Sequence, residues 1–410
     1  MDTPVDTRSQ ACAGLKVVEF AAYAAGPVVG KHLGDHGATV VHVESLTRPD
    51  GFRMQYPPYT DNRPGVNRSG TFALCNNNKY SVTIDLKAVG GIDLARRVVA
   101  WADVVIENFT PGTMKRLGLG YEDLSEINPS LVMLSSCNQG QTGPHAKHPG
   151  FGSQLTSLSG FTHVTGFPDG DPCLLYGPYI DFIGVGYGLI SVLAALDYRK
   201  RTGRGVYIDL AQYEAGLQFM APAVLDYGAN DHIMERMGNR NAAAAPHGVY
   251  PCAGEDRWCA VSVCSNEEWG RLREAMGDPA WAADARFATL EGRQADEDAI
   301  DRHIGEWTRD IDAPALMALL QGHGVHAGVV NRVRDLYTDP QYAHRGIWQA
   351  LDHPEMGTFH YQSPPFLLSE TPAALDRPSP CLGEHNERFF VETLGMPREE
   401  YESLVIEGVC

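Results

Sequence analysis

LKVVEFAAYAAGPVVGKHLGDHGATVVHVE, residues 15–44, is the stretch of the sequence that decides the fold. The apolar runs at 15–20 and 39–44 are typical of short strands, and the glycine-punctuated segment between them is typical of a helix. A strand, a helix and a strand within about thirty residues predict a βαβ unit, the opening of a doubly wound sheet. The turn AAYAAGP is not the GxGxxG of dinucleotide-binding proteins, so Glu44 at the end of the second strand gives an NAD site only weak support.

The same alternation continues along the chain. Strands are expected within 76–87, at 103–109 and at 132–137, and a helix at 90–102. We therefore predict an α/β fold with a mostly parallel sheet and ligands at the carboxyl ends of its strands. The sequence pattern changes after the strand and long helix expected from 206 onward, to short strands, turns and amphipathic helices. Residues 222–330 are predicted to form a smaller α+β domain, and 1–221 with 331–410 a large Rossmann-like domain to which the chain returns.

A second stretch, LLYGPYIDFIGVGYGLISVLAALDYR (174–199), carries one carboxylate at the head of a long apolar run. The run is too long for a typical strand and too short to span a membrane, which favours a buried helix. Asp181 would lie near the N-terminus of that helix. One interpretation makes it a helix cap. The other makes it a carboxylate nucleophile in a dry site lined by Gly177, Gly184, Gly186 and Gly188.

Composition narrows the class of protein. The 410 residues carry 33 basic and 51 acidic side chains, a net charge of −18, which disfavours nucleic-acid binding. The N-terminus, MDTPVDTRSQ, lacks the order of a secretory signal, so we expect a soluble, cytoplasmic protein that does not span a membrane. Nine scattered cysteines without a CxxC pair indicate reduced thiols rather than disulfides or a zinc site, and no metal is expected.

The familiar catalytic motifs are missing. The sequence contains no GxSxG, P-loop or HExxH, which leaves a carboxylate nucleophile as the candidate chemistry. Attack on a thioester would give an acyl-aspartyl anhydride, and the released CoA thiolate would convert it to an aspartyl-CoA thioester. This chemistry needs no metal or redox cofactor, but water must be excluded. Lys79, Lys87, Arg116 and Lys147 are candidates for holding phosphates, although isolated basic residues are mostly solvated.

Ten segments in order resemble the class III CoA-transferases, the carnitine/bile-acid CoA-transferase family that includes formyl-CoA:oxalate CoA-transferase. The resemblance covers residues 13–390. Its segments are GLKVVEFAAYAAGP, GATVVHVE, NNKYSVTIDLK, ADVVIENFTPGTMKRLGLGYEDLSEINPSL, GQTGP, RTGRGVYIDLAQYEA, GNRNAAAAPHGVYP, AGVVN, DPQYAHRG and LGEHN.

This resemblance implies a Rossmann-like large domain, a smaller domain and two subunits interlocked like rings. It implies Asp181 as the catalytic residue, CoA in the form of a thioester substrate, and an organic-acid partner. The CoA-binding residues are expected to be Ala24, Ala25, Ile84, Asp85, Lys87, Asn108, Phe109, Thr110, Arg116 and Lys147. The substrate-binding residues are expected to be Tyr23, Asn138, Gln139, Phe151 and Gln154.

Departures from the family pattern narrow the choice among the activities found in the family. Many members carry an acid after the aromatic residue at the position of Phe151, where this chain has Gly152, so a second acidic helper is in doubt. Related α-methylacyl-CoA racemases place a histidine near Phe151; because phenylalanine cannot transfer a proton, racemisation is disfavoured. A catalytically silent subunit that pairs with an active paralogue, in a heterodimer or heterotetramer, stays an alternative to the homodimer.

The substrates are the least constrained part of the prediction. The family favours succinyl-CoA as donor and a carboxylic acid as acceptor. If Tyr23, Tyr176, Tyr179 and Phe151 share one site, an aromatic acid or a substituted succinate such as benzylsuccinate would fit. Ordinary core packing is the competing explanation for these aromatic residues.

Overall fold

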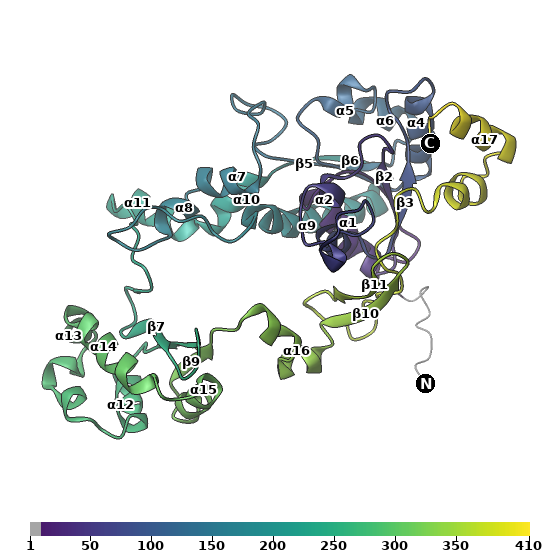
Figure 1. Cartoon of the computed structure of the whole chain (residues 1–410). Coiled ribbons are helices and arrows are strands. Elements are labelled where there is room, and N and C mark those ends of the chain that lie inside the picture. The colour runs from purple at the N-terminus through teal and green to yellow at the C-terminus, as the bar shows by residue number, and fades with distance from the viewer. Residues whose placement is uncertain (1–9) are drawn as a thin grey trace. The chain divides into compact units, whose positions relative to one another are not determined.

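The computed structural model describes residues 10–410. The expectation of no secretory signal rests almost entirely on residues 1–9, which lie outside the described residues. The chain forms two compact units (Figure 1). Unit 1 takes in the residues up to Phe161, Leu174–Asp231 and Gln341–Cys410, and unit 2 takes in Thr162–Cys173 and His232–Pro340. The units divide after 231 and 340, whereas the predicted small domain spans 222–330.

Unit 1 is built on a six-stranded sheet whose paired strands all run parallel. The strands are β1 (Lys16–Phe20), β2 (Thr39–Glu44), β3 (Lys79–Thr83), β4 (Val104–Glu107), β5 (Val132–Cys137) and β6 (Val206–Ala211). Their order is β3-β2-β1-β4-β5-β6, so the direction of the crossovers reverses between β1 and β4. The predicted α/β fold with a parallel sheet is confirmed.

Successive residues of β1 and β5 are buried, as in parallel sheets covered by helices on both faces. One face packs against α4 (Gly91–Trp101), α5 (Thr113–Arg116) and α6 (Tyr121–Ile127) through Val18, Val105 and Met133. The other face packs against α1 (Ala25–Asp35), α3 (Gly70–Asn76) and α9 (Tyr179–Thr202) through Val17, Val104 and Val132.

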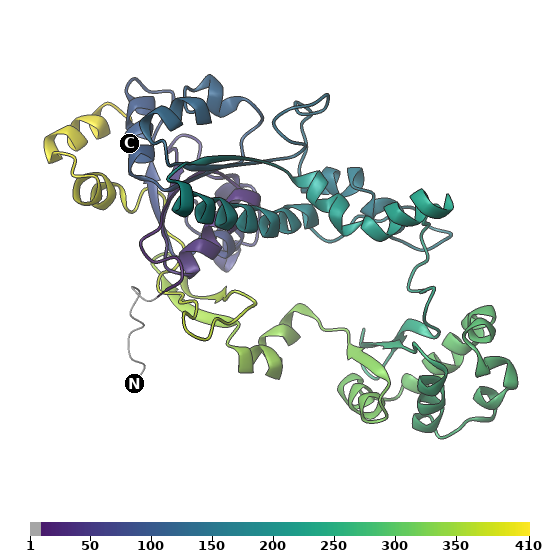
Figure 2. The same ribbon diagram turned by 180° about the vertical axis from the view of Figure 1, so that it is seen from behind.

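Helix α9 runs along this second face, as Figure 2 shows. It approaches the sheet closely at Gly188, where an added Cβ would lie 3.1 Å from Val29 and 3.3 Å from Leu134. The expectation of a buried helix is only partly met: one stripe is buried, including Ile180, Gly184, Val185 and Val192. The opposite stripe is exposed within this chain and contains Phe182, Tyr187, Ile190 and Leu193.

The helix also extends beyond the charge-free run, through Tyr198 to Thr202. By length and composition alone α9 would suffice to cross a membrane, contrary to the expectation from the shorter run. A single such helix is weak evidence, because core helices of soluble proteins meet the same criterion. Its contacts with α1 and with β5 and β6 are those of a helix that covers a sheet.

Between β6 and unit 2, the expected long helix is broken into α10 (Gln212–Phe219) and α11 (Ala221–Asn230). Pro222 stands in the first turn of α11, and proline has no N–H to continue the hydrogen bonds of a preceding helix. Shorter elements of unit 1 are α2 (Gly51–Met54), η2 (Thr60–Asn62) and α7 (Gly152–Leu158), while α8 (Phe161–Val164) and α16 (Pro340–Arg345) stand at unit boundaries.

The C-terminal segment returns to unit 1. It forms the antiparallel hairpin of β10 (Trp348–His353) and β11 (Gly357–Gln362), then η6 (Arg388–Thr393) and α17 (Arg398–Ile406). Asn386 fixes this segment to the edge strand β3, because its Oδ1 accepts the N–H of Thr83 at 2.8 Å. Phe389 and Phe390 enter the same core as α4.

Unit 2 has an antiparallel sheet of β7 (His247–Pro251), β8 (Trp258–Ser262) and β9 (His326–Val329), in that order. Its larger helices are α12 (Asn266–Ala275), α14 (Glu297–Thr308) and α15 (Ala313–Gly322). Its shorter ones are η3 (Ala280–Ala283), η4 (Ala285–Ala288), α13 (Leu290–Ala295) and η5 (Val333–Tyr337). A separate core, with Trp269, Phe287 and Leu316 at its centre, holds these elements together.

Candidate active site

Asp181 lies in the first turn of α9, two residues after its first residue, Tyr179. Pro178 occupies the N-cap position and no side chain caps the helix, so the interpretation of Asp181 as the cap is wrong. Among residues 10–410, no hydrogen bond or ion pair reaches the Asp181 carboxylate. Burial without a partner raises the pKa of this carboxyl to about 7.

The first turn of α9 is held by α7 and α10. Ile180 is fully buried in a small cluster with Leu155 of α7 and Phe161, and Tyr213 of α10 packs against it. Because Ile180 is fixed in this cluster, the neighbouring Asp181 has a defined backbone position.

Gly152 brings the start of α7 directly against Asp181. A Cβ at this position would stand 2.8 Å from Asp181 Oδ1 and 2.4 Å from Pro178 Cβ, so only glycine fits here. The side chain of Gln154 accepts a hydrogen bond from the N–H of Phe151 at 2.9 Å, which closes the first turn of α7. The position next to the Asp181 carboxylate is therefore occupied by a glycine and not by a second acid.

An aromatic group continues the site from Phe151 to the loop after β1. The Tyr23 ring meets Phe151 edge to face at 5.9 Å and Phe52 at 5.4 Å, and Tyr56 lies 6.1 Å away. Tyr23 has a φ of +63°, an uncommon conformation for a residue with a bulky side chain, and such strain persists only where the surroundings enforce it. Tyr23, Phe151, Gly152 and Asp181 thus form one continuous row of contacts.

Asp50 enforces that conformation. Its carboxylate accepts the N–H of Tyr23 at 3.1 Å and that of Phe52 at 2.8 Å, the second bond capping α2. Below it, Arg53 makes a two-pronged ion pair with Glu44, with both N···O distances at 2.8 Å. Burial alone would raise the pKa of Glu44, but the charge and hydrogen bonds of Arg53 outweigh burial and lower it.

The two loops at the reversal of the sheet order are tied together by Asn108. Its Oδ1 accepts the N–H of Ala22 at 2.9 Å, and its Nδ2 donates to the Ala22 carbonyl at 2.7 Å. Gly26 lies in the same place, and an added Cβ would meet Ala21 at 2.8 Å. In parallel sheets the crevice at such a reversal is the usual ligand site.

The residues expected to bind CoA lie around this end of the sheet, but they differ in burial and in hydrogen bonding. Ala24, Ala25 and Ile84 are buried, so at most their backbone would meet a ligand. Asp85 accepts the Lys87 N–H, Phe109 N–H donates to Glu107, and Thr110 contacts Thr113, which accepts a bond from Arg116. Lys87, Arg116 and Lys147 are exposed and, among residues 10–410, are in no ion pair.

Two sequence interpretations are corrected here. Lys79 cannot hold a phosphate, because it is fully buried and donates to Glu19, Asn76 and the Pro27 carbonyl. Glu44 is not free to bind a ribose, because Arg53 occupies both of its oxygens. The second finding removes the weak support for an NAD site.

The expected substrate-binding residues are also spread out. Asn138 donates to the Gly150 carbonyl at 2.9 Å and so shapes the loop before α7, and Gln139 follows it half-buried. The carbonyl oxygen of Gln154 is engaged in closing α7. Tyr179 packs with Phe161 and Phe219 instead of Tyr23, and Tyr176 is fully exposed, so within this chain only Tyr23 and Phe151 of the four aromatic residues meet.

Sequence reasoning missed Asp50, Gly152 as a contact of Asp181, and Glu107. Glu107 accepts the N–H of Phe109 and a bond from Gln141, and burial raises its pKa to about 7. Its position just before Asn108, at the end of a buried strand, was the available signal. The role of Asp50 had no sequence signal, because the positive φ of Tyr23 is visible only in the fold.

Comparison with known proteins identifies a family and several relatives of this chain. The family model described as CoA-transferase family III matches residues 12–386. The chain is 33% identical to "Succinyl-CoA--D-citramalate CoA-transferase" of Chloroflexus aurantiacus, over 96% of this chain and 97% of the relative. It is 32% identical to "Succinyl-CoA--L-malate CoA-transferase beta subunit" of the same organism, over 96% of each. The structure of a "CAIB/BAIF family protein from Brucella suis" superposes with a TM-score of 0.85 at 34% identity, covering 94% of this chain and 99% of that one.

The chain therefore belongs to CoA-transferase family III. It is an enzyme of the CoA-transferase class, and its substrates include a CoA thioester. The resemblance read from the sequence is confirmed.

Proposed function

We propose that this enzyme moves CoA from succinyl-CoA to a carboxylic-acid acceptor, with Asp181 as the covalent nucleophile. The observation that carries the proposal is the half-buried carboxylate without a partner in the first turn of α9. Two relatives are named for transfer from succinyl-CoA to dicarboxylic acids, which supports that donor and an acceptor with two carboxylates.

The steps follow from carboxylate chemistry. An Asp181 oxygen attacks the thioester carbonyl and the C–S bond breaks. The CoA thiolate departs, and an acyl-aspartyl anhydride remains. The thiolate attacks the aspartyl carbonyl, which releases succinate and leaves an aspartyl-CoA thioester. The acceptor carboxylate attacks the aspartyl carbonyl of this thioester and displaces the thiolate, which gives an anhydride between Asp181 and the acceptor. The thiolate then attacks the acceptor carbonyl of that anhydride, which frees the Asp181 carboxylate and gives the CoA thioester of the acceptor.

We propose that unit 1 is a Rossmann-like CoA-binding domain, and the strand order β3-β2-β1-β4-β5-β6 supports this. CoA would cross the reversal between β1 and β4, with its backbone contacts at Ala24, Ala25 and Asn108. The exposed Lys87, Arg116 and Lys147 would meet its phosphates. The Tyr23 and Phe151 rings would border the acyl group, and an aromatic or benzylsuccinate-type acceptor is the narrower form of this proposal.

Water must be kept from both intermediates, and a second subunit would do this. Phe182, Ile190 and Leu193 of α9, with Phe219 and Leu225 beyond it, leave an apolar surface exposed in the single chain. We propose that an interlocked copy of this chain covers it. A paralogous subunit is the second candidate, since one relative is named as a beta subunit. A cytoplasmic location stays a prediction.

Mass spectrometry with hydroxylamine tests the covalent role. After incubation with succinyl-CoA, hydroxylamine should leave a hydroxamate on the Asp181 peptide in the native enzyme and none in Asp181→Ala. The matched control is Asp171→Ala, since Asp171 is an exposed acid of the nearby sequence. Turnover of succinyl-CoA with an unmodified Asp181 peptide, or with the label on another residue, would exclude the proposed nucleophile.

A further inference from the structure

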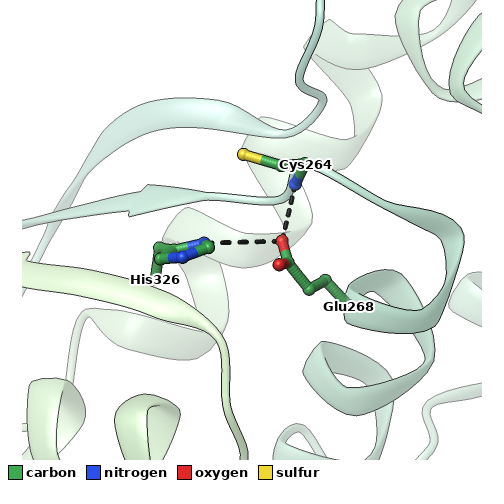
Figure 3. Close-up of side chains that lie close together, drawn as sticks. All are labelled: Cys264, Glu268 and His326. Carbon is green, nitrogen blue, oxygen red and sulfur yellow. Dashed lines mark hydrogen bonds and ion pairs between the residues drawn. The ribbon is translucent and has the colours of Figure 1, made fainter.

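Three side chains of different chemistry converge in unit 2, outside the CoA-transferase site. Ligand atoms of Cys264, Glu268 and His326 all lie within 4.8 Å of one another (Figure 3). The thiol follows β8, the carboxylate belongs to α12, and the imidazole begins β9. We propose that they form a binding site for a divalent cation of the Zn²⁺ type, with three protein ligands.

The register of the sheet brings the thiol and the imidazole together. His326 pairs with Ser262 across β8 and β9, so these two side chains share one face of the sheet. The Cys264 Sγ lies 3.4 Å from the Ser262 Oγ, on the same side. Both Cys264 and His326 are exposed, so neither side chain needs a rearranged core to turn toward a cation.

The carboxylate is held in place by the protein itself. Ser265 caps α12 by accepting the N–H of Glu268, and Glu268 Oε2 accepts the N–H of Cys264 at 2.7 Å. Capping alone explains why the Glu268 side chain points back along the chain. It does not explain why a thiol and an imidazole gather at that carboxylate, which is nearly buried.

The spacing suits Zn²⁺ coordination. With metal–ligand distances of about 2.0–2.3 Å, tetrahedral ligand atoms stand about 3.3–3.8 Å apart. His326 Nδ1 is 3.5 Å from Glu268 Oε2, within that spacing, and the three ligand atoms all lie within 4.8 Å of one another. Thiolate, imidazole and carboxylate are the donors that Zn²⁺ prefers. A pocket of about 300 Å³ that includes Ser262 and His326 adjoins the site and has room for water as a fourth ligand.

The sequence had suggested no metal site, because no histidine near Cys252, Cys259 and Cys264 completed a zinc spacing. The fold supplies His326 from a distant part of the chain. The site would join the end of β8, α12 and β9, and it rests on no feature of the Asp181 site.

The test is metal binding to the full-length enzyme after treatment with a chelator and desalting. Zn²⁺ titrated against a chromophoric chelator should bind at one equivalent per chain. Cys264→Ser and His326→Ala should each weaken binding at least about tenfold, since losing even an outer partner of a zinc site costs 10–100-fold. Co²⁺ should show a thiolate-to-cobalt absorption band that is lost in Cys264→Ser.

Cys173→Ser is the matched control, because Cys173 is also an exposed free thiol of unit 2. It should bind Zn²⁺ as the native enzyme does, and so should Asp181→Ala. The proposal is overturned by binding below one equivalent, by equal losses in Cys173→Ser and Cys264→Ser, or by unchanged binding in His326→Ala. Melting temperatures measured without metal would show that the variants are folded.

Discussion

Glu44 and Asp181 are two acids withdrawn from water in the same unit, and their surroundings shift their pKa values in opposite directions. Glu44 lies under α2 with both oxygens on Arg53, and its pKa is lowered. Asp181 lies in the first turn of α9 with no partner among the described residues, and its pKa is raised to about 7. The contrast separates a carboxylate that stabilises the fold from one that the fold leaves available for reaction.

The largest effect is expected where the paired acid loses its partner. Arg53→Ala would leave Glu44 buried and unpaired, which typically costs about 3–5 kcal/mol in the free energy of unfolding. Chemical denaturation at pH 7 measures this loss. The control is Arg97→Ala, which removes an exposed ion pair with Glu400 and should cost no more than about 1 kcal/mol. Equal losses in the free energy of unfolding for the two variants would show that the pair of Arg53 and Glu44 does not stabilise the fold.

The second prediction concerns activity and pH. Only the ionised Asp181 can attack a thioester, and with a pKa of about 7 its ionised fraction falls tenfold for each pH unit below that value. We expect kcat/KM to decline about 50-fold between pH 7, where half of the carboxyls are ionised, and pH 5, since this parameter reports the free enzyme. Initial rates with succinyl-CoA across this range test it. A profile that stays flat down to pH 5 would contradict the raised pKa.

The third prediction also concerns the free energy of unfolding, but here the substitution should stabilise the protein. The folded state binds the Asp181 proton more tightly than the unfolded state, so this group lowers stability as pH rises from about 4 through 7. Asp181→Asn should therefore stabilise the protein at pH 8, on the order of 1–3 kcal/mol, with a gain that shrinks toward pH 4. Melting temperatures of both proteins at the two pH values measure it. A variant less stable than the native enzyme at pH 8 would mean that Asp181 has a stabilising partner.

The smallest effect tests the close contact between Gly152 and the Asp181 carboxylate. In Gly152→Ala the new methyl would meet Asp181 Oδ1 and Pro178, which should shift the carboxylate and lower kcat about tenfold or more. Steady-state kinetics with a melting curve separates this from unfolding. Gly270→Ala is the control, because a Cβ there has nothing within 4 Å, and its activity should be unchanged. Native kinetics in Gly152→Ala would show that this glycine does not shape the site.

Much of unit 1 was predictable because parallel strands buried on both faces are written as apolar runs. The segments 15–20, 39–44 and 132–137 are strands within one residue of their predicted bounds. Helix α9 and the place of Asp181 in its first turn were predictable from one charge ahead of an apolar run. The break at Pro222 and the exposed stripe of α9 were not predicted, because a sequence shows which residues are apolar but not what covers them.

The sequence by itself determined the alternation of strands and helices, the family and the identity of the candidate nucleophile, because these depend on local pattern and ordered motifs. Only the tertiary structure decided which charged groups are paired. Lys79 and Glu44 looked available in the sequence and are locked in buried ion pairs, while Cys264 and His326 looked unrelated and lie together. Pairing depends on contacts between distant segments, and those contacts set the pKa and hence the chemistry of each group.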